Sequence, residues 1–254
     1  MTERIELRPL VDEIEALGTA RANESVTITS SVTEKVSRIG FEDGALVKAG
    51  DVLLELDQSE EQAILRQAEA LRGERELALN RQLQLQQKNL AAADEIDRNR
   101  LELEQARANI SAIRTRIADR VIRAPFDGIV GLRNISVGAL VETGDPVVTL
   151  DDLSRIKLDF SVPAVFLAEL RPGLRIEARS ATFPDKVFTG EVSSINSRVD
   201  PVTRSVTVRA LLPTPEARLR PGMFLTVTVL KEDVEALMIP EQAIVPERSN
   251  QYVF

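Results

Sequence analysis

The sequence predicts a mainly β protein into which an α-helical coiled-coil hairpin is inserted, and three observations lead to this fold class. A fourteen-residue string occurs twice, as GALVKAGDVLLELD at 44–57 and GALVETGDPVVTLD at 138–151. A polar segment of helical composition separates the two copies, and short apolar strands with regular turn signals follow the second copy. We therefore expect an elongated multi-domain chain with a split β-sandwich, the hairpin, a small β-barrel and a further, partial β-domain.

The repeat defines the sandwich. Eight of the fourteen aligned positions are identical, which makes the string a true internal repeat. Each copy has a glycine, a short apolar strand, a Gly-Asp turn and a second apolar strand. Gly44 and Gly138 should therefore occupy equivalent backbone positions. Because each half is too small to bury its own apolar face, 24–57 and 120–153 should pack as one domain.

Residues 58–119 read as two helices, because they are rich in Gln, Glu, Arg, Ala and Leu and contain no proline. The chain should reverse near 88–91. In the first helix Ile64, Leu71, Ala78 and Leu85 recur every seven residues, so we expect them at the seam. The second helix has the 3,4 spacing of a coiled-coil seam, at Ile96, Asn99, Leu103, Ala106, Ile110, Ile113 and Ile117.

The β-barrel should comprise 154–231 together with about 18–23. Apolar residues alternate at Ile156, Leu158, Phe160 and Val162, and Pro-Gly pairs mark turns at 172–173 and 221–222. The two ends of the chain, 1–17 and 232–254, should form the partial domain together, because neither holds enough strands alone. Since the sequence stops on the apolar trio at 252–254, we expect that domain to be incomplete.

Composition excludes several functions. A net charge of −8 gives no basic footprint for nucleic acid, and the absence of histidine and cysteine removes the usual metal ligands and general bases. The three methionines are scattered, and the sequence has no phosphate-binding loop. We expect no enzyme, no cofactor and no metal. No apolar run is long enough to span a membrane, and the N-terminus has no signal peptide.

With the split repeat and its helical insert established, the chain resembles a periplasmic adaptor, or membrane fusion protein, of a resistance-nodulation-division type efflux pump. The resemblance is carried by the order of five strings: VSRIGFEDGALVKAGDVLLELD (36–57), VIRAPFDGIVGLRNISVGALVETGDPVVTLD (121–151), VDPVTRSVTVRA (199–210), LRPGMFLTVTV (219–229) and IPEQAIV (239–245). It implies a lipoyl-like domain for the sandwich and a membrane-proximal domain for the two termini.

The resemblance also implies partners and a location. Such adaptors form rings, usually of six subunits, that join an inner-membrane transporter to an outer-membrane channel for export of drugs or amphiphiles. It implies a periplasmic protein attached to the inner membrane through an N-terminal anchor that this sequence lacks. At the hairpin tip, Arg81, Leu85 and Asp97 match the family's channel-binding pattern, whereas Ala92 stands where the family has serine.

Other readings remain open. An adaptor of an ABC-type exporter or a type I secretion system would share the architecture, although arms of about four heptads favour the efflux-pump branch. A lipoyl or biotinyl carrier domain would share the split sandwich. Such a carrier needs a modifiable lysine between the two halves, and Asp57 runs directly into Gln58 and the helices. A purely structural coiled-coil protein does not account for the β-rich part of the chain.

Overall fold

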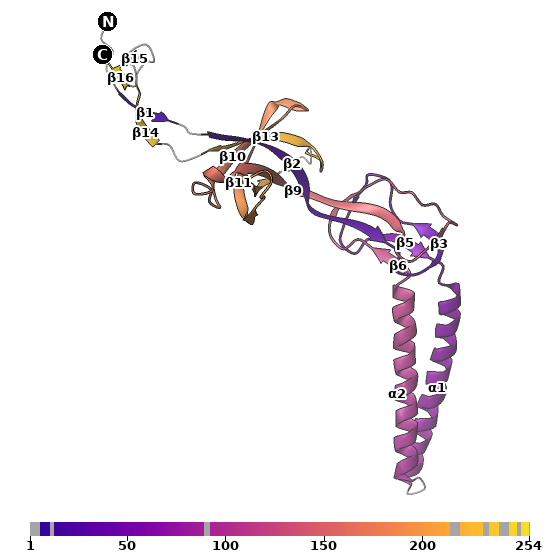
Figure 1. The fold of residues 1–254 in the computed structure, drawn as a ribbon. Coiled ribbons are helices and arrows are strands. Elements are labelled where there is room, and N and C mark those ends of the chain that lie inside the picture. The colour runs from indigo at the N-terminus through magenta and orange to yellow at the C-terminus, as the bar shows by residue number, and fades with distance from the viewer. Residues whose placement is uncertain are drawn as a thin grey trace. The chain divides into compact units, whose positions relative to one another are not determined.

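The computed structural model describes residues 6–10, 13–88, 92–213, 219–230, 234–238, 244–247 and 250–253. The chain divides into two compact units. One comprises residues 24–152, and the other combines the two ends of the chain, 1–23 and 153–254 (Figure 1). Strands β2 (Glu13–Thr29) and β9 (Pro146–Pro163) each contribute residues to both units.

The unit of residues 24–152 holds the repeat. Its complete strands are β3 (Glu34–Ile39), β4 (Leu46–Val47), β5 (Val52–Leu56), β6 (Val121–Arg123), β7 (Gly128–Val130) and β8 (Leu140–Val141). The pairing has internal symmetry at the repeat offset of 94. In the first half β3 pairs with β5, with Val36 opposite Leu56, and in the second β7 pairs with β9, with Val130 opposite Leu150.

Strands of each half also pair with strands of the other half. Strand β3 of the first half pairs with β8 of the second, and β4 of the first half pairs with β7 of the second. Gly44 and Gly138 have φ of +76° and +87°, so they occupy equivalent left-handed positions, as the sequence predicts. The buried side chains of both halves form one core, so neither half could close without the other. Its residues are Ile28, Val36, Val47, Leu53, Leu54, Leu56, Ala124, Val130, Val141, Val147, Val148 and Leu150.

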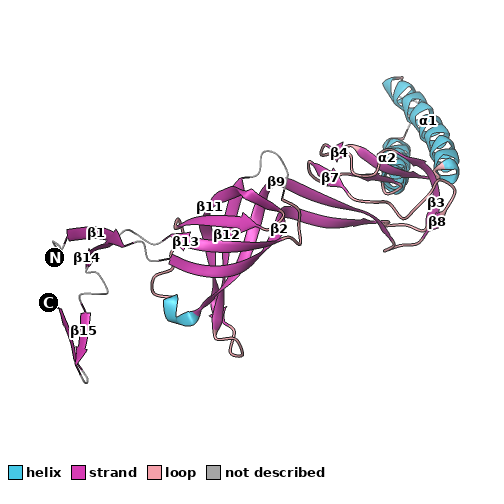
Figure 2. Ribbon diagram, turned by 90° about the horizontal axis from the view of Figure 1, so that it is seen from above, coloured by secondary structure: helices cyan, strands magenta, loops and turns pink. Residues whose placement is uncertain are grey.

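Two helices leave the sandwich between β5 and β6. Helix α1 (Ser59–Gln87) and helix α2 (Ala93–Ala118) lie side by side (Figures 1 and 2). The chain reverses between them, where residues 89–91 lie outside the described part. Asp57 accepts hydrogen bonds at its Oδ1 from the Ser59 amide (2.9 Å) and hydroxyl (2.5 Å), which fixes the start of α1.

The second unit contains a closed sheet. Its remaining strands are β10 (Arg175–Ser180), β11 (Phe183–Val199), β12 (Ser205–Pro213) and β13 (Phe224–Leu230), and a short 3₁₀ helix (Ala164–Phe166) follows β9. The order is β12-β11-β10-β13-β2-β9, and the pairing of β12 with β9 closes the sheet into a barrel. The predicted alternation of β9 is observed, because Ile156, Leu158, Phe160 and Val162 are all buried inside it.

The two ends of the chain share a sheet. Strand β1 (Glu6–Leu10) pairs antiparallel with β14 (Val234–Met238), and β15 (Ile244–Glu247) pairs with β16 (Asn250–Val253). The predicted boundary of the terminal stretch differs from the observed one, because Glu13–Thr19 pair with β13 of the barrel. The barrel therefore takes its N-terminal strand from residue 13 rather than from about 18.

Candidate functional site

The predicted tip residues lie near the far end of the hairpin. Arg81 and Leu85 are one turn apart on α1, where Arg81 is exposed and Leu85 is half-buried. Asp97 is exposed in the first turns of α2 and forms an ion pair with Arg100 at 3.5 Å. Within the described residues, no ion pair joins Arg81 to Asp97. The site is thus a set of side chains that share one end of the hairpin, not a preformed network.

Ala92 occupies the N-cap of α2. Its φ of −79° and ψ of 143° are the extended values of a capping residue, and its side chain makes no capping hydrogen bond. A serine at this position would accept a hydrogen bond from a free amide of the first turn. The departure from the family pattern therefore removes a helix cap as well as an exposed hydroxyl.

Polar contacts hold the two helices together close to these residues. Gln82 Nε2 donates to Glu95 Oε2 at 3.2 Å, and Arg75 forms an ion pair with Glu102 at 2.8 Å. Asn99, predicted at the seam, is half-buried and donates from Nδ2 to the Glu95 carbonyl at 2.8 Å. The contacts of Gln82 and Arg75 thus join the two helices beside the buried Ile96 and Leu103, whereas the Asn99 bond stays within α2.

The seam of α1 differs in part from the predicted one, since Ala78 and Leu85 are half-buried but the other two predicted residues are exposed. Ile64 and Leu71 are 37% and 41% exposed, and the buried residues of this helix are instead Glu61 and Ala68. The seam of α2 is as expected. Its buried residues are Ile96, Leu103, Ala106, Ile110 and Ile113.

Glu61 explains part of this difference. Its Oε1 lies 2.5 Å from Arg120 Nη2 just after α2, and the two side chains are only 11% and 14% exposed. The Arg120 carbonyl also accepts a hydrogen bond from the Leu56 amide at 2.9 Å, so this pair ties the base of both helices to the sandwich. The polar residues at 61, 75 and 82 were visible in the sequence, but their partners at 120, 102 and 95 were not.

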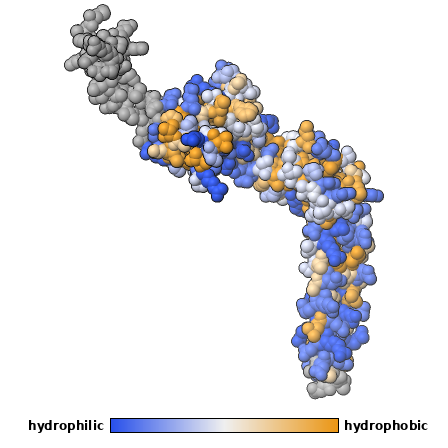
Figure 3. All heavy atoms as spheres, viewed as in Figure 1, coloured by the Kyte–Doolittle hydropathy of each residue, from blue (hydrophilic) through white to orange (hydrophobic). Residues whose placement is uncertain are grey.

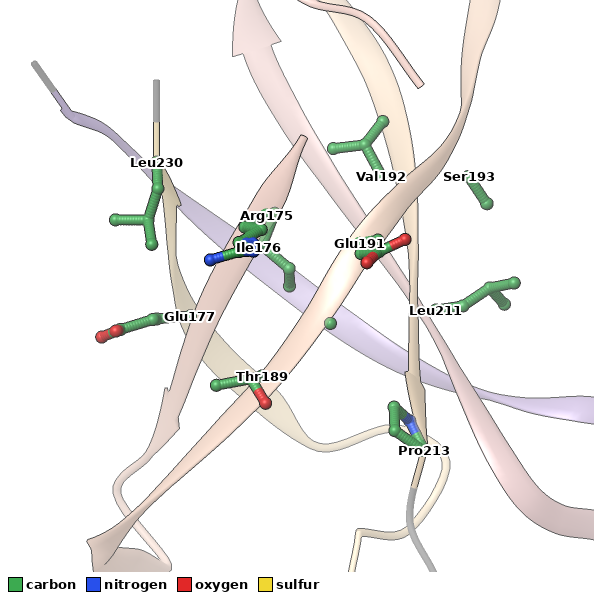
Figure 4. Close-up of a pocket in the computed structure, with 11 residues that line it drawn as sticks. Arg175, Ile176, Glu177, Thr189, Glu191, Val192, Ser193, Leu211, Pro213 and Leu230 are labelled. Atoms are coloured by element: carbon green, nitrogen blue, oxygen red, sulfur yellow. The ribbon is translucent and has the colours of Figure 1, made fainter. Parts of the chain in front are cut away.

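The barrel has a surface hollow of about 680 Å³ between β10, β11 and the ends of β12 and β13 (Figure 4). Arg175, Glu177 and Glu191 line it with Leu211, Pro213 and Leu230. Nothing in the sequence predicted this hollow. Within the described residues, no three His, Cys, Asp or Glu side chains lie together in a way that could hold a metal ion.

The same barrel carries a charge cluster. Asp159 on β9 accepts hydrogen bonds from Arg209 Nε at 2.6 Å and Nη2 at 2.8 Å, and Arg21 Nε lies 2.9 Å away. The bonds from Arg209 hold the pKa of Asp159 below its ordinary value, with the charges of Arg209, Arg21 and Lys157 acting in the same direction. The cluster joins β2, β9 and β12 and supports the closed barrel.

Two known family models match the two parts of the fold separately. Residues 24–150 match the family described as the barrel-sandwich hybrid domain of RND MFP, which is half of the chain, and residues 156–233 match the CusB-like β-barrel domain. The chain belongs to the RND membrane fusion protein family. This membrane fusion protein has no described helix that is both long and apolar enough to cross a membrane.

Curated relatives agree with the family. The membrane fusion protein is 29% identical over 233 residues to an uncharacterized protein of Haemophilus influenzae, covering 91% of this chain and 61% of that one. It is 28% identical over 263 residues to the multidrug resistance protein MdtA of Cronobacter turicensis, covering 94% and 63%. The chain thus spans less than two thirds of the length of these relatives.

Solved structures share its fold. A MacA–MexA chimera that contains the α-hairpin domain of Pseudomonas aeruginosa MexA has a TM-score of 0.85 at 20% identity, covering all of this chain and 92% of the chimera. ZneB from Cupriavidus metallidurans has a TM-score of 0.57 at 22% identity, covering 88% and 100%. At these identities the likeness establishes the fold of the membrane fusion protein and leaves its partners to be tested.

Proposed function

We propose that this chain is the adaptor subunit of a tripartite efflux pump in the periplasm, where it joins an inner-membrane transporter to an outer-membrane channel. The observation that carries the proposal is the helical hairpin inserted between the exchanged halves of a sandwich that matches the RND membrane fusion family. The relatives named as multidrug resistance proteins support drugs or amphiphiles as the exported class. The matches to RND family models favour an RND-type transporter over the ABC-exporter alternative.

The end of the hairpin is the proposed contact with the channel. Arg81 presents a charge on α1, Asp97 presents one on α2, and Leu85 adds a half-buried apolar surface one turn from Arg81. Ala92 completes this set at the start of α2. An exposed charge of this kind orients the partner and speeds association, because an oppositely charged partner is attracted and a like charge is repelled.

The remaining parts would complete the assembly. We infer self-association into a ring, and six subunits is the number that the family resemblance implies. A head-to-tail contact that closes would give such a ring its cyclic symmetry. The sheet that joins β1 to β14 supports a membrane-proximal domain built from both ends of the chain. We also propose that the protein is attached to the inner membrane through an N-terminal anchor. We propose no enzymatic step, cofactor or nucleic acid for any part.

The proposal is tested in a strain that lacks its own adaptor but carries the cognate transporter and channel. The full-length protein should restore resistance to the exported drugs. Arg81→Asp should abolish the restored resistance while the melting curve of the purified chain stays unchanged, since reversing an exposed charge typically costs within about 0.5 kcal/mol.

Arg66→Asp is the matched control, because Arg66 is also an exposed arginine on α1 but lies near the sandwich. It should restore resistance as the parent does. Full resistance with Arg81→Asp would show that Arg81 is an ordinary solvated residue. Failure of the parent protein to restore any resistance, when it is expressed with both partners, would count against the adaptor function itself.

A further inference from the structure

The two copies of the repeat place the same short strand at the edges of two sheets. Strand β4 is the last strand of the eight-stranded sheet, and β8 is the last strand of the four-stranded sheet. Their registers are equivalent, because Leu46 lies opposite Ile129 and Leu140 lies opposite Lys35, with both members shifted by 94 residues. Edge strands are the places where another chain can add to a sheet. The sandwich therefore offers two equivalent edges to a partner.

Each edge presents an exposed leucine. Leu46 is 76% exposed and Leu140 is 59% exposed, whereas the next residues, Val47 and Val141, are buried. Because successive side chains of a strand point to opposite sides, both leucines point away from the core. Apolar residues do reach the surface of the unit that holds the sandwich (Figure 3). Single exposed leucines are common on soluble proteins, so the leucines alone do not identify a partner.

The residue after each strand is charged, and its sign differs between the two edges. Lys48 follows β4 and Glu142 follows β8, at the same position of the repeat, and both are exposed. Within the residues that the structure describes, neither side chain belongs to an ion pair. The amide of Lys48 donates to Asp51 Oδ2 and that of Glu142 to Asp145 Oδ2, both at 2.8 Å, so the two turns are held alike. One edge thus presents a cation where the other presents an anion.

This inversion of charge distinguishes two ways in which copies of the chain could meet. Two copies that meet through the same edge bring two lysines, or two glutamates, into one contact, and like charges disfavour such a pairing. Copies that meet through different edges bring Lys48 and Glu142 into one contact together with the two leucines. A contact between different surfaces is head-to-tail, so each copy keeps one edge for the next copy. A second copy of this chain is therefore the partner whose charge matches both edges.

We propose that the lysine edge (Leu46 and Lys48) docks on the glutamate edge (Leu140 and Glu142) of a second copy of this chain. The leucines supply apolar surface that leaves water, and the charges decide which edges meet. Residues 24–152 hold both edges, so the contact needs no other protein. The use of this contact to close a ring rests on the proposed function, whereas the contact itself is a property of this chain.

Thiol cross-linking tests which edges meet, because the sequence contains no cysteine. One chain carries L46C, and a second chain, made longer by a tag, carries L140C. When a short bismaleimide is added to an equal mixture, the product that joins unlike chains should exceed either product of like chains by about fivefold. A chain that carries both substitutions should give trimers and longer products, because every cross-link leaves one edge of each copy free.

Charge exchange provides the decisive variant. K48E in the L46C chain should lower the mixed product by about fivefold, which is the upper range for one exposed ion pair. Adding E142K to the L140C chain rebuilds the pair in the opposite sense and should restore the product. R66E is the matched control, because Arg66 is an exposed cation of the same unit that lies on α1, and it should leave the yield unchanged.

Three results would overturn the proposal. Like chains could be joined as often as unlike chains, or E142K could fail to restore the product that K48E removes. The mixed product could also stay at the level given by R66C, a thiol away from both edges, which would assign the edges to a partner of another kind. Melting curves check that each variant is folded, and if K48E alone is destabilised, the charge-exchanged pair decides.

The outcome can be separated from that of the adaptor function. None of these measurements involves a transporter or a channel, so their failure would leave the proposed adaptor function standing. Conversely, failure to restore drug resistance in the strain would leave a contact that had been shown by cross-linking.

Discussion

The two Gly-Asp turns of the repeat allow one substitution to be tested twice in equivalent surroundings. Gly50 and Gly144 have φ of +89° and +93°. Their amides donate to the carbonyls of Ala124 and Ser30, both at 2.8 Å, and these two acceptors are themselves 94 residues apart. A Cβ added at either glycine would meet no atom within 4 Å. Replacement by alanine should therefore act through the backbone conformation alone.

The expected magnitude follows from two opposing effects. A left-handed conformation costs a non-glycine residue about 1–2 kcal/mol. Alanine also restricts the unfolded chain, which returns about 0.4–1 kcal/mol. Gly50→Ala and Gly144→Ala should thus each lower the free energy of unfolding by about 1 kcal/mol, and by similar amounts.

Urea unfolding followed by far-ultraviolet circular dichroism measures both values. Gly73→Ala is the control, because Gly73 lies inside α1 with open space around it and without a positive φ. There the same change should raise the free energy of unfolding by about 1 kcal/mol. The reasoning is refuted if Gly50→Ala and Gly144→Ala leave stability unchanged, or if their effects differ by more than about 1 kcal/mol.

Three further predictions concern other parts of the fold. Ala92→Ser should stabilise the hairpin by about 1 kcal/mol by capping α2, and a melting midpoint at or below that of the parent would contradict this. Gly128→Ala should cost more than Gly50→Ala, about 3 kcal/mol, because its Cβ would lie 2.7 Å from the Asp151 carbonyl oxygen. Equal urea midpoints for the two variants would exclude that clash. Because the folded-state pKa of Asp159 is lowered, its contribution to stability is complete above its unfolded pKa and lost as pH falls through the folded pKa. The free energy of unfolding of Asp159→Asn, measured by urea titration, should therefore fall less than that of the parent as the pH drops below about 4. Identical pH profiles of the two proteins would count against this role.

Much of the fold could be predicted from local sequence. The repeat strings specify their own turns, because Gly44, Gly50 and their counterparts supply left-handed positions where strands must reverse. The strict alternation at Ile156, Leu158 and Phe160 predicts a strand with one buried face, since successive side chains point to opposite sides. The two helices can also be predicted from local sequence, because a long stretch without proline and with apolar residues at 3,4 spacing favours a helix over other structures.

The candidate site was predictable only in its position along the chain. The family resemblance placed Arg81, Leu85, Ala92 and Asp97 at the hairpin tip, and the structure has α1 ending at Gln87 and α2 beginning at Ala93. How Arg81 and Leu85 face depends on which side of α1 packs against α2. Sequence reasoning set that side from apolar residues and was wrong about Ile64 and Leu71.

The sequence by itself thus determined the split sandwich, the two helices and the strands of the barrel, because these depend on turn residues and periodicity within short segments. The tertiary structure decided the rest. The seam of α1 depends on Glu61 meeting Arg120, and the barrel closes because β9 pairs with β12. Such contacts join residues more than about forty positions apart in the chain. Their free energy depends on geometry that only the folded chain creates, since an ion pair replaces apolar burial only where both charges reach each other out of water.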